Sequence, residues 1–357
     1  MKICFLIDDF SATGGIQRVV PLIASNLDAF YDVHVVSMYN EHNSENLSFY
    51  KTKRGVHILI KGKKEYVKQC LKASKLLRDY IINNSIDILI STSEMLTPYC
   101  LLTKSFLDLE FMCWTHSTAY RYNESILQRP FKFLMMHSAD KVIALTQTIK
   151  KELDIKYKTN NVTVISNPID PKLFNDKAYK SDSKKIITVG RFCFEKYYEK
   201  LVEVANIVLK NNTEWTWDIF GNGASFDEIK QLVEESGLSN QLKLMGSVND
   251  LYDRYNEYSI LVMTSRSEAY PMALLEGIAS KLPLIAFGIP SIKELIRDNY
   301  NGYIVEPFDA EEMASKIQNL ISDESKRIEF SNNNSLMSDS YKIDEIIKQW
   351  KNIIENN

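Results

Sequence analysis

The sequence has few cysteines, and none lies at a spacing typical of a bridged or metal-binding protein. Its 357 residues include five, at positions 4, 70, 100, 113 and 193, and no Cys-x-x-Cys motif occurs. An odd number of scattered cysteines argues against a disulfide framework and against a structural zinc site. We therefore expect reduced thiols, which are typical of a cytoplasmic protein.

Long apolar runs are also absent. No segment approaches the roughly 20 apolar residues that span a bilayer. The N-terminus is apolar over Ile3–Ile7 and acidic at Asp8 and Asp9, whereas a signal peptide needs a longer apolar region and a small-residue cleavage site. This segment predicts a buried first strand instead.

Neither sign of charge is in large excess. The chain holds 43 Lys and Arg against 46 Asp and Glu, a net charge of −3, which does not indicate a nucleic-acid-binding protein. A content of 45% hydrophobic and 25% charged residues excludes a disordered or fibrous chain. Residues 1–175 hold 22 Lys and Arg against 17 Asp and Glu (+5), and residues 176–357 hold 21 against 29 (−8). This asymmetry suggests two domains with different partners, or chance variation between two solvated surfaces.

Short apolar segments that alternate with helical patterns predict two α/β domains. At roughly 100–200 residues per domain, the length itself favours two. The segments are rich in Ile and Val and bounded by polar or turn residues, as buried parallel strands are. Two such runs predict two Rossmann-like domains with parallel sheets facing a central cleft. The expected strands are Lys2–Ile7, Val33–Met38, Val56–Ile60, Ile86–Ile90, Phe111–Trp114, Lys141–Leu145 and Val162–Ile165, then Lys185–Val189, Trp215–Phe220, Leu242–Met245, Ile260–Thr264 and Leu284–Phe287.

A charged segment with two prolines, residues 168–185, predicts a linker between the domains. An Asn- and Ser-rich break is expected at Ser331–Ser340, and it would allow the last helix to leave the second domain. We expect domains at 1–170 and 171–340, with 341–357 returning to the first. The expected helices are Ile16–Phe30, Lys63–Ile82, 197–210, 225–236, 249–257, 271–281, 292–297, 309–322 and Ile343–Ile354.

The segment Ser265–Gly277 carries two carboxylates on either side of an expected helix start. Pro271 suits the first turn of a helix. Glu268 would then lie in the loop after a strand, and Glu276 more than one turn into the helix. The free N–H groups near Met272–Leu275, helped by the helix dipole, would form an anion site. The carboxylates could hold hydroxyl groups that flank a phosphate, although an isolated pair is more often a pair of solvated charges.

Two glutamates separated by seven residues, in E-A-Y-P-M-A-L-L-E-G, resemble the signature of the family 4 glycosyltransferases, which have the GT-B fold. Gly190-Arg191-Phe192 followed by Glu195-Lys196 resembles the segment in which an Arg and a Lys of that family bind the donor diphosphate. Two cations directly after the first strand of the second half suit a pyrophosphate leaving group, although each alone would more often be a surface charge. The resemblance extends over nearly the whole chain and is densest from residue 186 to 306.

Other segments agree with this family in order and spacing. Gly14-Gly15 resembles its first glycine-rich loop, and Phe220–Gly223 resembles its strand-to-loop glycine pair. A dinucleotide fingerprint would need a third glycine, so NAD binding is disfavoured. Tyr197 and Ala269 stand where the family commonly has Gly, which bears on the choice of donor. Trp114–Ser117 matches the segment that carries the family's histidine near the sugar, and Ile165–Asp170 matches its interdomain turn. Met245–Val248 matches its nucleobase loop, and Phe287–Val305 matches its late signature.

The resemblance implies a retaining glycosyltransferase. It would move a sugar from a nucleotide sugar, UDP-linked first and GDP-linked second, to a glycan or lipid-linked saccharide in cell-surface polysaccharide synthesis. Cations and a helix N-terminus would stabilise the charge that develops on the leaving diphosphate. The resemblance implies His116 and Glu268 as catalytic residues; Gly15, Arg191, Lys196, Leu274 and Leu275 at the diphosphate; Glu276 at the ribose; Ala269, Tyr270, Pro271 and Met272 at the sugar; and Gly221, Asn222 and Val248 at the nucleobase.

No metal or other cofactor is expected. Glycosyltransferase folds that use manganese carry Asp-x-Asp, and the nearest motif, Asp108-Leu109-Glu110, precedes an expected strand instead of following one. No cluster of His, Cys and carboxylate residues has zinc spacing, and no Gly-x-Ser-x-Gly motif indicates a hydrolase. Since no residue is a convincing covalent nucleophile, front-face attack assisted by the donor phosphate is favoured.

The basic first half would then meet the acceptor. Its lysines suit an anionic surface, and Tyr120–Tyr122 and Arg129–Met136 mix cations with large apolar groups. We expect peripheral contact with the inner face of an anionic membrane, unless Arg129–Met136 is a core helix with ordinary lysines around it. Two alternatives to a transferase remain, a non-catalytic partner subunit of this fold and a sugar-nucleotide epimerase. The lysines of the first half that suit an anionic surface are Lys61, Lys63, Lys64, Lys68, Lys72 and Lys75.

Overall fold

The chain forms two compact units, each built around its own parallel sheet. The computed structural model describes residues 1–11, 14–41, 52–62, 68–105, 107–118, 128–174 and 177–356. One unit comprises Met1–Pro168 and Ile343–Asn357, and the other comprises Ile169–Lys342. Among the predicted features, Lys63, Lys64, Tyr120–Tyr122, Asp176 and the start of the expected helix at 63–82 lie outside the described residues.

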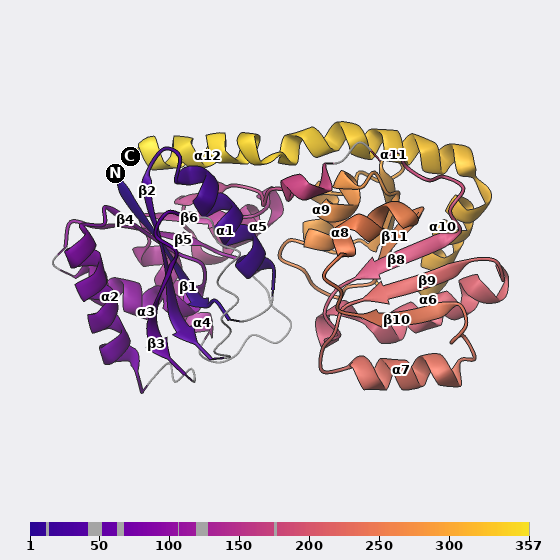
Figure 1. Ribbon diagram of the computed structural model, residues 1–357, viewed down its shortest axis with the longest axis horizontal. Helices are drawn as coiled ribbons and strands as arrows, with labels where there is room; N and C mark the ends of the chain where they lie inside the picture. Colours follow the sequence, from indigo (N-terminus) through magenta and orange to yellow (C-terminus); the bar gives the residue numbers. More distant parts are fainter. Residues whose placement is uncertain are drawn as a thin grey trace. The chain divides into compact units, whose positions relative to one another are not determined.

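The first unit contains a seven-stranded parallel sheet with the order β3-β2-β1-β4-β5-β6-β7 (Figure 1). Ile3–Ile7 of β1 are at most 1% exposed, as expected for a parallel sheet covered on both faces. The chain places β2 and β3 on one side of β1 and then returns to place β4 on the other. The strand order therefore reverses between β1 and β4. The strands are β1 Lys2–Asp9, β2 Asp32–Asn40, β3 Val56–Lys61, β4 Ile88–Ser91, β5 Glu110–Trp114, β6 Lys141–Ala144 and β7 Val162–Val164.

The last helix of the chain, α12, completes the core of the first unit. It packs against α1 (Figure 1), and its Trp350 is fully buried. The Trp350 ring meets those of Phe5 and Trp114, with centroid distances of 5.8 and 4.9 Å. Lys141 Nζ also donates to the carbonyl of Ile353 at 2.8 Å. The helices of this unit are α1 Gly15–Leu27, α2 Cys70–Asn84, α3 Thr97–Lys104, α4 Gln128–Ser138, α5 Gln147–Tyr157 and α12 Ile343–Glu355, with a 3₁₀ turn, η2, at Glu94–Leu96.

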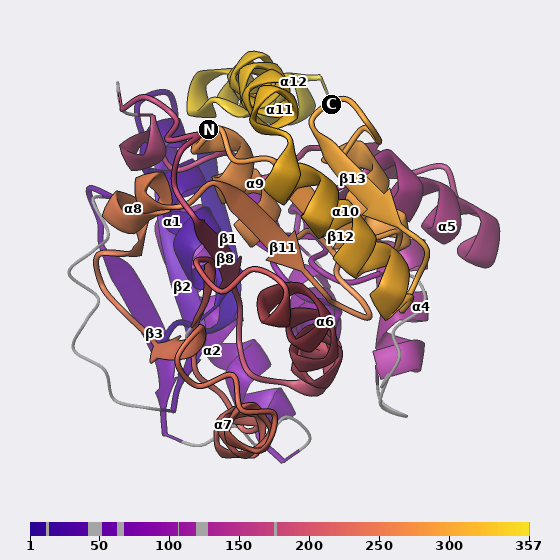
Figure 2. The ribbon, with the colours of Figure 1, turned by 90° about the vertical axis from the view of Figure 1, so that its right-hand side faces the viewer.

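The second unit has a six-stranded parallel sheet with the order β10-β9-β8-β11-β12-β13. Its order reverses between β8 and β11. Helix α6 packs against α10, and α9 packs against β11 and β12 (Figure 2). The strands are β8 Lys185–Val189, β9 Thr216–Phe220, β10 Leu242–Gly246, β11 Ile260–Met263, β12 Leu284–Phe287 and β13 Gly302–Val305. The helices are α6 Tyr198–Lys210, α7 Phe226–Glu235, α8 Leu251–Arg254, α9 Met272–Ala279, α10 Ala310–Ser322 and α11 Glu324–Ser338, with 3₁₀ turns η3 Pro171–Leu173, η4 Phe194–Lys196, η5 Tyr255–Glu257, η6 Pro290–Glu294 and η7 Asp339–Tyr341.

The predicted α/β fold with two parallel sheets is confirmed. Every expected strand is present, with ends within two residues of those predicted, and β8 and β12 coincide with their predictions. The expected helix at 292–297 is wrong, because that region forms the 3₁₀ turn η6 instead. Strand β13 and helices α3, α5 and α11 are additional elements, and α4 forms at Arg129–Met136, where a helix was the alternative. Among the described residues, no helix combines the length and the apolar character needed to cross a bilayer.

The break expected at Ser331–Ser340 is wrong, since most of it lies in α11. Asn and Ser favour turns, but buried contacts outweigh that preference here. Asn334 is fully buried, and its Nδ2 donates to the carbonyls of Leu282 at 2.8 Å and of Asn301 at 3.0 Å. Its Oδ1 accepts a hydrogen bond from Asn301 Nδ2 at 2.8 Å. The polar side chain therefore ties this helix to two distant segments instead of ending it.

Candidate active site

The candidate site of the second unit lies where its strand order reverses, at the carboxyl ends of β8 and β11. Open parallel sheets bind ligands at such a point, because connections leave it in opposite directions. The turn η4 after β8 carries Lys196, and the loop after β11 carries Glu268. Lys196 Nζ lies 2.6 Å from Glu268 Oε1, and the side chains are 17% and 15% exposed. Ser265 Oγ donates to the same oxygen at 2.8 Å.

Arg266 connects the loop after β11 to the turn η4. Its backbone N–H donates to the Glu195 carbonyl at 2.7 Å, and its Nη1 donates to the Phe194 carbonyl at 2.8 Å. The guanidinium carbon lies 3.4 Å from the centroid of the Tyr197 ring and 4.0 Å from that of Phe194. Such cation–π contacts add to the hydrogen bonds. The loop that carries Glu268 therefore has a defined position relative to the turn that carries Lys196.

Tyr197, which stands where the family commonly has Gly, adopts the left-handed conformation with φ 54°. This conformation costs a residue with a side chain roughly 1–2 kcal/mol, which explains why glycine is common there. The Tyr197 ring contacts Arg266 and lies edge-on to Phe308, with a centroid distance of 5.6 Å. The contacts of the aromatic ring offset the backbone strain.

Two glycines allow close packing beside Lys196. A Cβ on Gly190 would lie 2.8 Å from Lys196 Cε, so the lysine side chain runs directly over this residue. Gly221 has φ +143°, and a Cβ there would lie 1.8 Å from the Gly190 carbonyl oxygen. The Gly221 N–H donates to the Gly246 carbonyl at 2.9 Å. Gly221 thus links the loop after β8 to the end of β10, two residues before Val248.

Helix α9 begins at Met272, with the buried Pro271 as its N-cap residue. The N–H groups of Leu274 and Leu275 both donate to the Pro271 carbonyl, at 3.0 and 3.3 Å. The expectation of free N–H groups as far as Leu275 is therefore wrong, because the first turn of the helix already uses them. The helix dipole still favours an anion at this end. A direct role of Leu274 and Leu275 at a diphosphate stays a prediction.

Glu276 lies inside α9 and is only 3% exposed. The hydroxyl of Tyr255, which is fully buried, donates to Glu276 Oε2 at 2.5 Å. A buried carboxylate is stable only when hydrogen-bonded, so Tyr255 supports Glu276. Tyr255 cannot be identified from the sequence, since nothing in its own segment indicates a contact with a residue 21 positions away.

The remaining predicted donor residues of the second unit differ in exposure. Arg191 is exposed and, within the described part of the chain, makes no hydrogen bond or ion pair. Ala269 and Met272 are half-buried, and Tyr270 is buried. Asn222 is exposed, with its Oδ1 accepting a hydrogen bond from the Gly223 N–H at 2.8 Å, and Val248 is half-buried.

In the first unit, the predicted residues His116 and Gly15 follow β5 and β1. The His116 ring lies against Trp114, with a centroid distance of 4.6 Å. Its Nε2 is buried and has no hydrogen-bond partner among the described residues. Burial lowers the pKa of His116 from 6.5 to about 3, so the imidazole is neutral near pH 7. Gly15 is exposed and begins α1.

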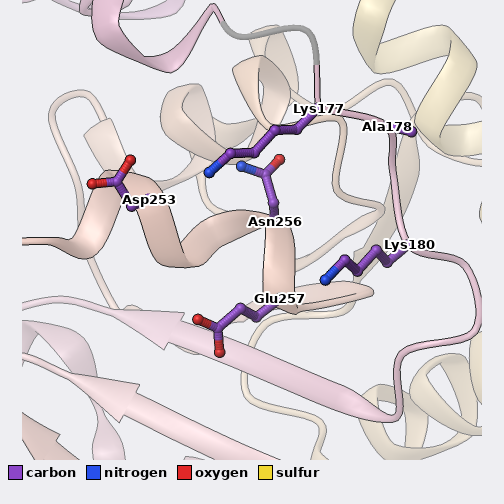
Figure 3. Close-up of a pocket in the computed structure, with 6 residues that line it drawn as sticks. All are labelled: Lys177, Ala178, Lys180, Asp253, Asn256 and Glu257. Carbon is purple, nitrogen blue, oxygen red and sulfur yellow. The ribbon is translucent and has the colours of Figure 1, made fainter.

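An open pocket of about 480 Å³ lies elsewhere in the second unit (Figure 3). None of the predicted site residues lines it. Two cations from the segment before β8 and two carboxylates from α8 and η5 line it, so its charges offset each other. Within the described residues, no three His, Cys, Asp or Glu side chains gather as metal ligands would. The pocket is lined by Lys177, Ala178, Lys180, Asp253, Asn256 and Glu257.

Two parallel α/β units, with charged side chains at the strand reversal of the second, define a protein of the GT-B class. The model of Glycosyltransferase Family 4 matches residues 13–173, and the model of Glycosyl transferases group 1 matches residues 170–337. Together they cover the chain from residue 13 to residue 337. The chain belongs to the family 4 glycosyltransferases and is a glycosyltransferase, which sets aside the epimerase and the non-catalytic subunit.

Relatives matched over their whole length agree with this assignment, and solved structures agree with the fold. An uncharacterised glycosyltransferase of Haemophilus influenzae is 28% identical over 357 residues, covering 99% of each chain. The amylovoran biosynthesis glycosyltransferase AmsD of Erwinia amylovora is 26% identical over 367 residues, again covering 99% of each. Anabaena HepE, solved in complex with UDP, has a TM-score of 0.86 at 17% identity over 100% of both chains. Sucrose-phosphate synthase of Thermosynechococcus elongatus also gives 0.86, at 16% identity over 100% of this chain and 99% of the other.

Proposed function

We propose that this glycosyltransferase transfers a sugar from a UDP-sugar, with retention of configuration, to a glycan or lipid-linked saccharide in cell-surface polysaccharide synthesis. The observation that carries the donor assignment is the Lys196–Glu268 ion pair at the strand reversal, 2.6 Å between charged atoms. One member suits a diphosphate and the other suits sugar hydroxyls. A GDP-sugar is the second choice of donor.

Donor binding would exchange the partners of this ion pair. The diphosphate carries more negative charge than one carboxylate, so it competes for Lys196. Glu268, still bonded to Ser265, would then accept hydrogen bonds from the hydroxyls of the sugar. Arg191 supplies a second cation for the diphosphate, and Glu276 would bind the ribose. The nucleobase would lie along Gly221, Asn222 and Val248.

In the proposed reaction the bond between the sugar C1 and the diphosphate oxygen breaks. A bond from C1 to the acceptor oxygen forms on the same face, and the acceptor proton goes to the departing phosphate oxygen. Lys196, Arg191 and the positive end of α9 would stabilise the charge that develops on the diphosphate. The neutral His116 would hydrogen-bond the sugar without placing a second positive charge there.

The choice of UDP draws on related proteins. Anabaena HepE was solved with UDP and with UDP-glucose, and Staphylococcus aureus TarM with UDP. The family relatives include a poly(ribitol-phosphate) α-N-acetylglucosaminyltransferase of Staphylococcus aureus and AmsD, named for amylovoran biosynthesis. One name refers to a polyol-phosphate polymer and the other to amylovoran, so they support transfer during polymer synthesis and leave the sugar and the linkage open.

We also propose that the first unit contacts an anionic membrane peripherally. Helix α3 packs against both α2 and α4, and these two helices carry exposed cations beside exposed apolar side chains. Leu71 on α2 is 79% exposed and Phe133 on α4 is 56% exposed. Such a mixture suits an anionic lipid surface. The exposed cations are Lys72 and Lys75 on α2, Arg129 on α4, and Lys68 two residues before α2.

Flotation with vesicles of phosphatidylglycerol and phosphatidylcholine tests the membrane contact. We expect binding that weakens as salt rises, since surface charges are screened. The variant Lys72→Glu/Lys75→Glu should float less than the wild type. No salt-sensitive binding of the wild type would remove the membrane proposal without affecting the donor assignment.

A thermal-shift screen of UDP, GDP, ADP, CDP and TDP tests the donor. We expect UDP to raise the melting temperature most, because a ligand that binds only the folded state stabilises it. Hydrolysis and transfer assays with UDP-sugars would follow. A preference for NAD over every nucleoside diphosphate would overturn the proposal.

A further inference from the structure

The strand reversal of the first unit lies between β1 and β4, and a carboxylate stands there that the proposed donor site does not use. Glu94 follows the end of β4 by three residues, in the turn η2, and is only 5% exposed. Its position corresponds to that of Glu268, which follows the strand after the reversal in the second unit. Ligands bind at such points in open parallel sheets.

Glu94 has little to compensate its buried charge. Ser117 Oγ donates to Glu94 Oε2 at 3.3 Å, which is long for a hydroxyl donor. Among the described residues Glu94 has no ion pair. The buried Lys132 of α4 donates instead to the Thr118 carbonyl at 2.9 Å. An ionised carboxylate can accept about four hydrogen bonds, so most of the capacity of Glu94 is unused.

The charge of Glu94 acts within the interior of the unit. Burial, together with a smaller effect of Glu94, raises the pKa of the Cys113 thiol to about 12. A buried carboxylate with few partners is costly, and Glu residues are rarely buried unless paired. By contrast, Glu268 at the equivalent point has both Lys196 and Ser265. Glu94 therefore keeps acceptor capacity that a hydrogen-bond donor of a ligand could use.

A polar group without a partner among the described residues follows the neighbouring strand. Strands β4 and β5 are paired in parallel, with Ser91 opposite Cys113, so the residues after them leave the same edge of the sheet. His116, after β5, has a buried Nε2 with no hydrogen-bond partner in the described part of the chain. A carboxylate with one long hydrogen bond and a ring nitrogen without a partner, both at one sheet edge, indicate a ligand site.

We propose that Glu94 is an acceptor-binding residue that accepts a hydrogen bond from a hydroxyl of the acceptor saccharide. A carboxylate repels phosphates, so it suits the uncharged saccharide part of a substrate and not the nucleotide. The cations of the donor site belong to the second unit, which leaves Glu94 for the other substrate. This inference rests on the proposed transfer reaction and adds a residue that selects its acceptor.

The test uses full-length wild type, Glu94→Gln and Ser117→Ala, with Asp79→Asn as the control at an exposed carboxylate of the same unit. Envelope fractions from a deletion strain of the source organism supply the acceptor, and a radiolabelled UDP-sugar supplies the donor. Melting temperatures, the UDP-induced shift and acceptor-independent hydrolysis of the UDP-sugar are measured in parallel. We expect Glu94→Gln to lower incorporation at least about tenfold, the loss of one hydrogen bond to a charged group.

The other readouts separate this role from a structural one. Glu94→Gln should keep the wild-type melting temperature or exceed it, because a poorly compensated buried charge is removed. The UDP shift and hydrolysis should match the wild type, and Ser117→Ala and Asp79→Asn should retain most incorporation. Unchanged incorporation by Glu94→Gln would overturn the inference, as would a lower melting temperature or an equal loss of hydrolysis. If the wild type neither binds UDP nor uses a UDP-sugar, the proposed function itself fails, and the inference fails with it.

Discussion

At the scale of single residues, the donor site is held ready by interactions that a substrate must replace. Lys196 and Glu268 neutralise each other at 2.6 Å, and Tyr255 satisfies Glu276 at 2.5 Å. Each contact keeps a charged side chain in place. A substrate must displace that partner in order to bind the side chain. Preorganised charge of this kind stabilises a transition state without further reorganisation of the protein.

Replacing Lys196 with Ala should lower transfer about 10²–10³-fold, because charge developing on the diphosphate loses one of its cations. The UDP-induced rise in melting temperature should also shrink. Steady-state transfer assays and thermal shift measure both effects, with the exposed Lys230→Ala on α7 as the matched control. Equal activity of the two variants would show that Lys196 is a surface charge.

His116 should make stability depend on pH in the acid range. Its pKa is lowered from 6.5 to about 3 by burial, so between these values the unfolded chain binds a proton that the folded chain does not. Stability therefore rises with pH in this window and is complete above pH 6.5. The melting temperature of His116→Gln should fall less between pH 6.5 and 4 than that of the wild type. Parallel curves for the two proteins would contradict the assignment.

At the scale of elements, strands were more predictable than helices. Strands β8 and β12 are short apolar runs between polar residues, and burial on both faces leaves such sequences few alternatives. Helix α11 could not be predicted, because the hydrogen bonds of Asn334 join it to Asn301 and Leu282, far away in sequence. Composition alone favoured a break there.

The candidate site shows the same limit. The two glutamates at 268 and 276 were identified from their spacing and the family resemblance. Arg266, which stands two residues before Glu268, was overlooked because its role depends on the Phe194 and Tyr197 rings of another loop. Glu94 was overlooked because only the strand order places it at a reversal point. A single sequence does not show which distant segments contact each other in the fold.

Replacing Asn334 with Ala should destabilise the second unit by about 2 kcal/mol. It leaves buried main-chain carbonyls without their donor, and each unsatisfied group carries a desolvation penalty. Urea denaturation followed by tryptophan fluorescence measures the loss, with the exposed Asn332→Ala of the same helix as the control. Similar stabilities of the two variants would mean that α11 is held by other contacts.

At the scale of the whole molecule, the first unit is assembled from two stretches of chain. Helix α12 closes its core with the fully buried Trp350, which contacts Phe5 and Trp114. The second unit, Ile169–Lys342, lies between these stretches in sequence. The stability of the first unit therefore depends on residues at the far end of the chain.

Replacing Trp350 with Ala should destabilise the first unit by about 3–5 kcal/mol, the usual cost of removing a buried Trp side chain. UDP affinity should change little, since the proposed donor residues other than Gly15 and His116 belong to the second unit. Differential scanning calorimetry and UDP titration measure the two properties, with the exposed Gln349→Ala as the control. A loss of UDP affinity equal to that of Lys196→Ala would contradict this division.

The position of α12 also sets an order of events during synthesis. Domains fold as units while the chain emerges from the ribosome, and the strands around Phe5 and Trp114 are made first. They cannot complete their core until Trp350 has been translated, by which time Ile169–Lys342 is already available to fold. The unit whose strands are translated first therefore completes its core last. A chain that is interrupted before Trp350 would leave the ribosome with an exposed aromatic surface, which chaperones and proteases can recognise.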